Sequence, residues 1–144
     1  MTILVFSDSH GHMSNMRGLI KKFMPDFVIH LGDYARDAGR LEHPQVIGVY
    51  GNCNYNINSP KHMLVEIAGK RFMLTHGHAY GVKQGLDNLI RAAVLNDADA
   101  VLYGHTHKQY YARRGNMVIL NPGPADERAA LLTVGESEIE IELL

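Results

Sequence analysis

The sequence has almost no cysteine, almost no net charge and no long apolar run. One cysteine, Cys53, among 144 residues excludes an intrachain disulfide framework and is typical of a reducing compartment. A formal net charge of −1 excludes a general electrostatic attraction to nucleic acid or to an anionic membrane surface. No apolar run approaches the roughly 18 residues of a membrane span, and an apolar segment rather than a basic leader begins at Thr2. We therefore expect a cytoplasmic protein without a membrane or nucleic-acid partner.

The chain also lacks any feature that would divide it. It contains no linker rich in proline, glycine or serine, no low-complexity tract and no internal repeat. Hydrophobic residues make up 46% of the chain and charged residues 20%, which is enough to build a core without disulfide bonds. Residues 1–144 are therefore predicted to form a single domain.

Short apolar segments alternate with polar loops in the first half of the chain. Residues 2–6, 27–29 and 46–50 are apolar and each run ends in a polar loop, which is typical of buried parallel strands. Between the first two runs, apolar residues from Met13 to Phe23 recur at helical spacing, and Ser14 is the candidate N-terminal cap. The pattern predicts strand, helix, strand, loop and strand.

The second half predicts hairpins. Two pairs of short apolar segments flank a glycine-led dipeptide: residues 63–67 and 72–75 around Gly69-Lys70, and residues 110–113 and 117–120 around Gly115-Asn116. Residues 86–94 have helical spacing, residues 100–103 form a buried strand, and residues 138–143 alternate between apolar and acidic side chains. Partly parallel and partly antiparallel strands with two helices predict a β-sandwich with the helices outside. The exposed C-terminal strand could pair between subunits, so an oligomer is one expectation.

Nine histidines are the anomaly of the composition, and five of them lie beside glycines. Metal-capable side chains occur in five loops, each directly after a predicted strand: Asp8-Ser9-His10, Gly32-Asp33, Gly51-Asn52, His76-Gly77-His78 and Gly104-His105-Thr106-His107. Loops at the carboxyl ends of strands gather at one end of a sheet. On an extended loop, positions i and i+2 point to the same side, and glycines let the backbone come close to an ion. We expect a metal centre with imidazole and carboxylate ligands, which suit Mn, Fe, Zn or Ni.

Taken together, the five loops resemble the calcineurin-like metallophosphoesterase superfamily, and more closely its small bacterial and archaeal phosphodiesterases. The D-x-H, G-D, G-N, H-G-H and G-H-T-H elements of that family occur here in order between residues 8 and 107, followed by Asn121-Pro122-Gly123. The resemblance implies an α+β / α/β fold: a four-layer α/β/β/α sandwich of two mixed β-sheets with helices outside, the metallo-dependent phosphatase fold.

The resemblance also implies two divalent transition metal ions, with Mn preferred and Ni, Fe or Zn as alternatives. Two sets of ligands would share one carboxylate: Asp8, His10, Asp33 and His107 for the first ion, and Asp33, Asn52, His76 and His105 for the second. A bridged pair about 3.5–4 Å apart suits in-line displacement at phosphorus by a metal-bridging hydroxide. The implied activity is hydrolysis of small-molecule phosphodiesters and some monoesters.

The implied catalytic residues are Asp33, Asn52, His78 and Cys53. His78 either hydrogen-bonds the substrate phosphate or a bridging water, or supports the metal ligands. Many family members carry a histidine after G-N that protonates the leaving group, and small members often carry cysteine then aspartate. Here Cys53-Asn54 supplies neither, so leaving groups that need little protonation are favoured, or an acid comes from elsewhere. Cys53 itself is either reactive or a small buried hydrophobe.

Several other side chains have ordinary interpretations. His30 lies in an apolar strand and is expected to be a hydrogen-bonded core histidine, whereas Asp37 is expected to be solvated, like most charged loop residues. His12 follows the first motif and is explained equally well by helix entry. Four tyrosines in loops and hairpins could stack on an aryl or nucleobase group: Tyr55, Tyr80, Tyr110 and Tyr111.

Two other functions stay open at this stage. One is a non-catalytic protein-interaction scaffold on the same fold, like the retromer subunit of the superfamily, which has lost part of its metal site. The other is a mononuclear hydrolase or a metal-binding protein that shares only the ligand types. Every implied metal-binding position is present in this chain, which favours the enzyme.

Overall fold

Two five-stranded sheets form the centre of the protein. The structure, a computed structural model, describes residues 1–32, 35–49 and 60–144, and of residues 35 and 36 only the backbone. The first sheet has the order β10-β9-β1-β2-β3. Its strands are β1 (Thr2–Phe6), β2 (Phe27–His30), β3 (Val46–Gly48), β9 (Ala130–Val134) and β10 (Ile139–Leu143). β1, β2 and β3 run parallel, while β9 runs antiparallel to both β1 and β10.

The second sheet repeats this mixed pattern. Its order is β4-β5-β6-β8-β7. Its strands are β4 (Met63–Ile67), β5 (Lys70–Leu74), β6 (Ala100–Leu102), β7 (Tyr110–Arg114) and β8 (Met117–Asn121). β5, β6 and β8 are parallel, and the outer strands β4 and β7 pair antiparallel to their neighbours. The expected mixture of parallel and antiparallel pairing is confirmed.

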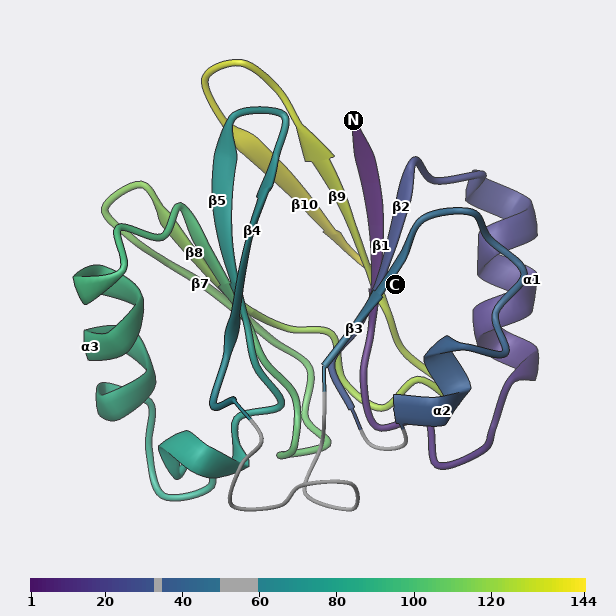
Figure 1. Ribbon diagram of the computed structural model, residues 1–144, viewed down its shortest axis with the longest axis horizontal. Coiled ribbons are helices and arrows are strands. Elements are labelled where there is room, and N and C mark those ends of the chain that lie inside the picture. The colour runs from purple at the N-terminus through teal and green to yellow at the C-terminus, as the bar shows by residue number, and fades with distance from the viewer. Residues whose placement is uncertain (33–34, 50–59) are drawn as a thin grey trace.

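The helices lie outside the sheets. They are α1 (Ser14–Phe23), α2 (Ala35–Ala38), α3 (Asp87–Leu95) and the short 3-10 helix η1 (His78–Tyr80). Figure 1 shows α1 and α2 on the outer side of the first sheet and α3 on the outer side of the second. The four-layer α/β/β/α sandwich is therefore confirmed. No helix among the described residues is long and apolar enough to cross a membrane.

Both faces of the central strands are buried, and alternate residues enter different cores. In β1, Ile3 and Val5 pack into the core between the sheets, and Leu4 and Phe6 pack against α1. β8 behaves in the same way: its even-numbered apolar residues face the other sheet, and Met117 and Ile119 pack beneath α3. Strands buried on both faces need continuous apolar runs, which explains the sequence pattern.

Three details differ from the sequence expectations. The residue before helix α1 is Met13, with no side-chain capping bond, so the expected cap at Ser14 is wrong and Ser14 is the first helical residue. The first hairpin turn consists of Ala68 and Gly69, one position earlier than expected, because Ile67 pairs with Lys70. Both turn residues have positive φ, which matches the twist of the flanking strands. Strand β9 was not expected at all.

The parallel strands of each sheet bring the predicted site loops together. The segments after β1, β5 and β6 lie at the lower end of the sandwich in the view of Figure 1. A backbone hydrogen bond from Gly104 to the His76 carbonyl, 2.9 Å long, joins two of them directly. The core between the sheets thus determines how closely the site loops approach one another.

A substitution in the core between the sheets should cost far more than one on the outer helix. Leu102 is fully buried in β6, and Leu102→Ala should lower the free energy of unfolding by about 2–5 kcal/mol. Leu95, 77% exposed at the end of α3, is the matched control, and Leu95→Ala should change it by less than about 0.5 kcal/mol. Urea denaturation measures both, and equal losses would contradict this assignment of the core.

Candidate metal centre

The carboxylate of Asp8 is buried at the point where the two sheets meet. The residue is 2% exposed and is the second residue after the end of β1. Its Oδ2 accepts a 2.6 Å hydrogen bond from Ser7 Oγ and a 3.0 Å bond from the backbone N–H of His105. Its Oδ1 has no hydrogen-bond donor among the described residues. A buried charged oxygen is costly without a partner, so Oδ1 is placed to meet a cation.

The first group of candidate ligands joins loops from both sheets. Asp8, His10 and His107 each offer one ligand atom, and these atoms all lie within 4.8 Å of one another. Asp8 Oδ1 and His107 Nε2 are 3.3 Å apart. These are three of the four residues that the resemblance implies for the first ion. Asp33, the fourth, lies outside the described residues.

The second group lies beside the first. His76 Nε2 is 3.1 Å from His105 Nδ1 and 3.7 Å from Asp8 Oδ1. Nitrogen ligands about 2.0–2.1 Å from one metal ion and at right angles to each other are about 3 Å apart, so the two imidazoles fit one ion. Asn52, the amide ligand implied for the same ion, lies outside the described residues.

A hydrogen bond from the opposite sheet fixes the tautomer of His76. Its Nδ1 lies 2.7 Å from the carbonyl oxygen of Leu31, which can only accept, so Nδ1 carries the proton. That arrangement leaves Nε2 with its lone pair directed at His105. Metal-ligating histidines usually donate their other ring N–H to a carbonyl or carboxylate. The donor set and its supporting contact therefore fit a transition metal.

The loops converge through left-handed backbone rather than through extended segments. Asp8 and His10 have φ of 54° and 47°, and His105 and His107 have φ of 71° and 59°. The expectation of extended D-x-H and H-x-H segments is therefore wrong for these two loops. Left-handed conformations are uncommon for residues other than glycine and persist only where their surroundings enforce them. Four of the seven such residues in the described chain are predicted ligands.

Gly104 allows the closest contact between the loops. A Cβ atom at this position would collide with Ser7 Oγ and lie 2.7 Å from Asp8 Oδ2. Glycine is required at this position for space and not for a left-handed backbone, because Gly104 does not have a positive φ. Glycine before His105 is therefore needed for the His105 N–H to reach the Asp8 carboxylate.

Asn121, at the end of β8, is a supporting residue to which the sequence assigned no role. It is fully buried, and its Nδ2 donates to the carbonyl of Gly104 at 3.2 Å and to Thr106 Oγ1 at 2.9 Å. Its Oδ1 accepts a 2.9 Å bond from the N–H of Gly123. One amide thus ties the Asn121-Pro122-Gly123 element to the loop that carries His105 and His107.

His78 belongs to the same cluster of rings. Its centroid is 5.5 Å from that of His76 and 6.1 Å from that of His105. It begins the 3-10 helix η1 after Gly77, whose φ of 106° turns the chain at this point. The structure brings His78 to the site, and its role toward substrate stays a prediction.

The cluster keeps His105 neutral. Burial first, and then the neighbouring His76 and Lys83, lower the pKa of His105 to about 4 against the opposing effect of Asp8. A neutral imidazole has a lone pair available for a metal, and protons compete for that lone pair only in acid.

A buried polar network supports the loop of Asp8 and His10 from behind. Ser9, His30 and Asp37 are all fully buried. Gly32 N–H donates to His30 Nδ1, His30 Nε2 lies 2.8 Å from Ser9 Oγ, and Ser9 Oγ donates to Asp37 Oδ2 at 2.6 Å. The expectation for His30 is confirmed, whereas the expectation that Asp37 is solvated is wrong. Asp37 Oδ2 also accepts from Gly11 N–H, so it holds the chain on both sides of His10.

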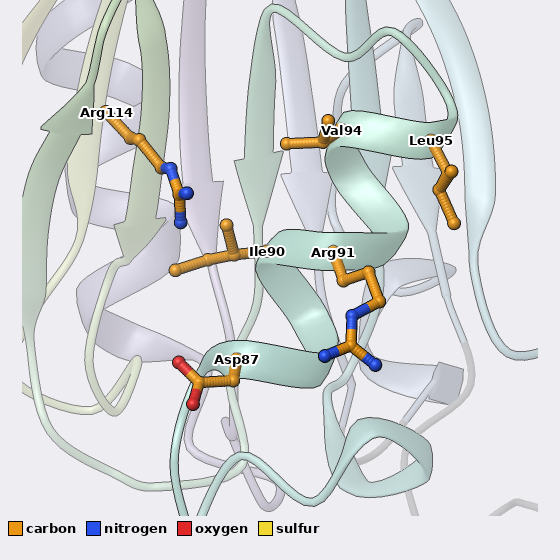
Figure 2. A pocket seen from close by; sticks show the side chains of 6 residues that line it. All are labelled: Asp87, Ile90, Arg91, Val94, Leu95 and Arg114. Atoms are coloured by element: carbon orange, nitrogen blue, oxygen red, sulfur yellow. The ribbon is translucent and has the colours of Figure 1, made fainter.

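Hollows of the surface differ in their relation to these loops. One of about 280 Å³ opens at His10 and His107 and is also lined by His12, so His12 lies nearer the site than its sequence context indicated. Another, of about 340 Å³, is lined by residues of α3 and by Arg114 at the end of β7. Figure 2 shows it with Asp87 and Ile90 on the helix and Arg114 of β7 beside them, and no predicted site residue lines it.

Known proteins with similar sequences are phosphoesterases by name. The calcineurin-like phosphoesterase superfamily domain matches residues 1–136. A phosphodiesterase of Methanocaldococcus jannaschii is 30% identical over 145 residues, covering 85% of this chain and 83% of that protein. A probable metallophosphoesterase of Bacillus subtilis (strain 168) is 29% identical over 125 residues, covering 85% of this chain and 74% of that protein.

Solved structures share the arrangement of the two sheets. A predicted phosphoesterase from Streptococcus pneumoniae TIGR4 is 26% identical with a TM-score of 0.81, and the match covers 99% of this chain and 88% of that one. Vps29 of Entamoeba histolytica, in complex with zinc, has a TM-score of 0.77 at 21% identity over 100% of this chain and 98% of that one, which shows likeness of fold alone. With its fold, its converging loops and a match over residues 1–136, this chain belongs to the calcineurin-like phosphoesterase superfamily.

Proposed function

We propose that this protein is a dinuclear metal-dependent phosphodiesterase that hydrolyses small phosphodiesters, and some monoesters, by in-line displacement. The observation that carries the proposal is the pair of adjacent donor groups that meet at Asp8 Oδ1, one with His107 Nε2 at 3.3 Å and one with His76 Nε2 at 3.7 Å. The family and the names of the relatives support hydrolysis of phosphate esters. We further propose a single domain over residues 1–144 and a cytoplasmic location.

The proposed cofactor is a pair of divalent transition metal ions, with Mn preferred over Ni, Fe or Zn. Asp8, His10 and His107 would hold one ion, His76 and His105 the other, with Asp33 shared and Asn52 completing the second set. When bound, such ions polarise phosphoryl oxygens and lower the pKa of coordinated water, which supplies a nucleophile near neutral pH.

The protein contributes orientation and a fixed charge distribution. Ser7 Oγ and the His105 N–H hold Asp8 Oδ2, so the carboxylate cannot rotate and Oδ1 stays directed at the imidazoles. The Leu31 carbonyl holds His76 in one tautomer, so its Nε2 needs no reorganisation before it acts as a ligand. Preorganised groups of this kind stabilise charge that develops on a phosphoryl group without further rearrangement.

His78 is the proposed contact to the substrate phosphate, because it is the remaining imidazole beside His76 and His105. Cys53 and Asn54 lie outside the described residues, and preference for leaving groups that need little protonation stays a prediction from the sequence.

A scaffold without catalysis is the alternative, because Vps29 of Entamoeba histolytica has the same fold. The complete set of donors among the described ligand positions favours the enzyme. Purified protein that leaves bis-p-nitrophenyl phosphate intact at saturating Mn or Ni would overturn the proposed activity and favour the scaffold.

Replacing the negatively charged carboxylate of Asp8 by a neutral amide should strongly reduce metal-dependent hydrolysis. The native chain should bind two ions, measured by elemental analysis, and hydrolyse bis-p-nitrophenyl phosphate. Asp8→Asn should lower kcat/KM at least about 100-fold, because it removes the charge at both donor groups. Asp87→Asn, in the hollow on α3, should leave kcat/KM unchanged. One ion per native chain would contradict the dinuclear centre.

A methyl group at Gly104 should disturb the close contact between the loops that carry Asp8 and His105. Gly104→Ala displaces the His105 N–H from Asp8, so metal affinity should fall about 10- to 100-fold in a metal-binding titration. Gly18→Ala in α1 is the matched control, because nothing lies within 4 Å of its added Cβ and alanine favours a helix by roughly 0.5–1 kcal/mol. Equal metal affinity in both variants would contradict the close approach of the two loops.

The neutral state of His105 should make the metal-free protein less stable in acid. The folded pKa is about 4 and the ordinary value is 6.5, so the unfolded chain binds a proton first as the pH falls. The free energy of unfolding should therefore decrease as the pH falls from about 6.5 to about 4. Above this window His105 is neutral in both the folded and the unfolded chain, so it should add nothing to the pH dependence. Urea midpoints of the metal-free protein between pH 7.5 and 4.5 measure this, and His105→Gln should flatten the decline. An identical slope in that variant would contradict it.

A further inference from the structure

A second, larger groove begins at the loop that carries His105 and His107. It has a volume of about 570 Å³, and its lining includes Val82, Lys83, Leu86, Tyr103, Lys108 and Tyr110. We call it the lysine–tyrosine groove. Val82 and Tyr103 are 5% and 3% exposed and form its floor, while Tyr110 is 44% exposed and both lysines are exposed at its rim. Neither the ligand assignment nor the proposed activity uses any of these side chains.

Two contacts connect this groove to the candidate metal centre. Thr106, which also lines the groove, lies between His105 and His107 in the chain. Val82 packs against Gly77, between His76 and His78, so closely that a Cβ on Gly77 would lie 2.9 Å from Val82 Cγ2. The groove therefore borders both histidine loops.

The chemistry of the groove fits an anion joined to an aromatic ring. Lys83 and Lys108 are cations, and no carboxylate occurs among the described residues that line the groove. Gln109 also lines the groove, and its Nε2 is already engaged, because it donates to the carbonyl oxygens of Pro122, Ala129 and Leu144. Tyr110 offers an exposed ring above an apolar floor, and base–aromatic stacking is tolerant of the identity of the base. Ammonium groups bind phosphate oxygens strongly.

The hollow on the other side of the His107 loop has the opposite character. Its lining includes Asp126 and Glu127, both exposed, together with His12 and Pro124. A second negative charge on the substrate would be repelled on that side and attracted on the side of Lys83 and Lys108. The two surfaces around one loop thus assign a direction to an anionic substrate.

Of the four tyrosines proposed from the sequence, three are described by the structure, and among these only Tyr110 lines the groove. Tyr80 OH is 2.6 Å from His62 Nδ1, and Tyr111 is partly buried against the core between the sheets, where its hydroxyl accepts from Arg113. Tyr55 lies outside the described residues. Among the described tyrosines, Tyr110 is therefore the candidate for stacking, and it lies in a groove with two lysines.

We propose that the lysine–tyrosine groove binds the nucleotide-like arm of a phosphodiester substrate, an aromatic base with an attached phosphate, while the scissile phosphate lies at the metal centre. This inference rests on the proposed function, because it names the class of substrate for the same site. The base would stack on Tyr110, and the additional phosphate would lie between Lys83 and Lys108. Substrates with such an arm should have a lower KM than bis-p-nitrophenyl phosphate.

Calorimetric binding of three probes to the full chain in EDTA tests the groove separately from catalysis. Adenosine supplies the ring, ribose 5-phosphate supplies the anion, and adenosine 5′-monophosphate supplies both. The monophosphate should bind most tightly. Lys83→Ala and Lys108→Ala should each weaken it by about tenfold, as expected for loss of a charge-assisted contact, and Tyr110→Ala should weaken adenosine and the monophosphate but not ribose 5-phosphate.

Matched variants localise the effect. Lys83→Arg retains the charge and should keep most of the affinity, whereas Lys22→Ala removes the same charge from α1, against Phe23, and should change nothing. If the monophosphate did not bind, or bound equally to wild type and Lys83→Ala, the proposed role of the groove would be wrong, even if bis-p-nitrophenyl phosphate were hydrolysed. Binding that depends on Lys83 and Tyr110 in a protein without hydrolytic activity would retain the groove and overturn the proposed function instead.

Discussion

The Asp8 carboxylate is the contact on which the site depends, because it joins the two sheets at their common end. Asp8 is the second residue after the end of β1, while the N–H that donates to its Oδ2 belongs to His105, in the loop after β6 of the other sheet. Moving one sheet relative to the other would break this bond and separate the donors at the same time. The apolar core between the sheets therefore acts on the chemistry, because it fixes the distance between Asp8 and the histidine loops.

The site retains a strained backbone that the rest of the fold stabilises. Asp8, His10, His105 and His107 all have positive φ, each at a cost of order 1–3 kcal/mol. Buried polar residues behind the loops offset this cost. Asp37 accepts hydrogen bonds from Ser9 and Gly11, the two neighbours of His10, and Asn121 donates to Gly104 and Thr106. Such supports hold the candidate ligand atoms in one arrangement, which is the preorganisation that the proposed catalysis requires.

The surface around the His107 loop gives the proposed enzyme two unlike sides. Asp126 and Glu127 border the hollow beside His10, and Lys83 and Lys108 border the groove beyond Thr106. With a net charge of only −1, the protein has no strong overall field, so local charges decide how an anionic substrate is oriented. Specificity in a chain of this size thus depends on a few side chains next to the metal loops.

The sequence by itself determined the layers, most strands and the identity of the site loops. Continuous apolar runs such as residues 2–6 can be buried on both faces, and parallel strands place the loops that follow them at one end. It did not predict β9, whose Ala130 and Thr133 give no clear alternation, or the turn at Ala68-Gly69, where pairing of β4 with β5 decides which residues take positive φ. The sequence also did not predict the burial of Asp37 or the hydrogen bonds of Asn121, because both depend on contacts between residues that are distant in the sequence. Only the tertiary structure decided that Gly104 needs space against Ser7 and Asp8. It also decided that the lysines and the carboxylates lie in different hollows beside the His107 loop. Both features depend on distances between segments that are far apart in the sequence, and such distances leave no local pattern in the chain.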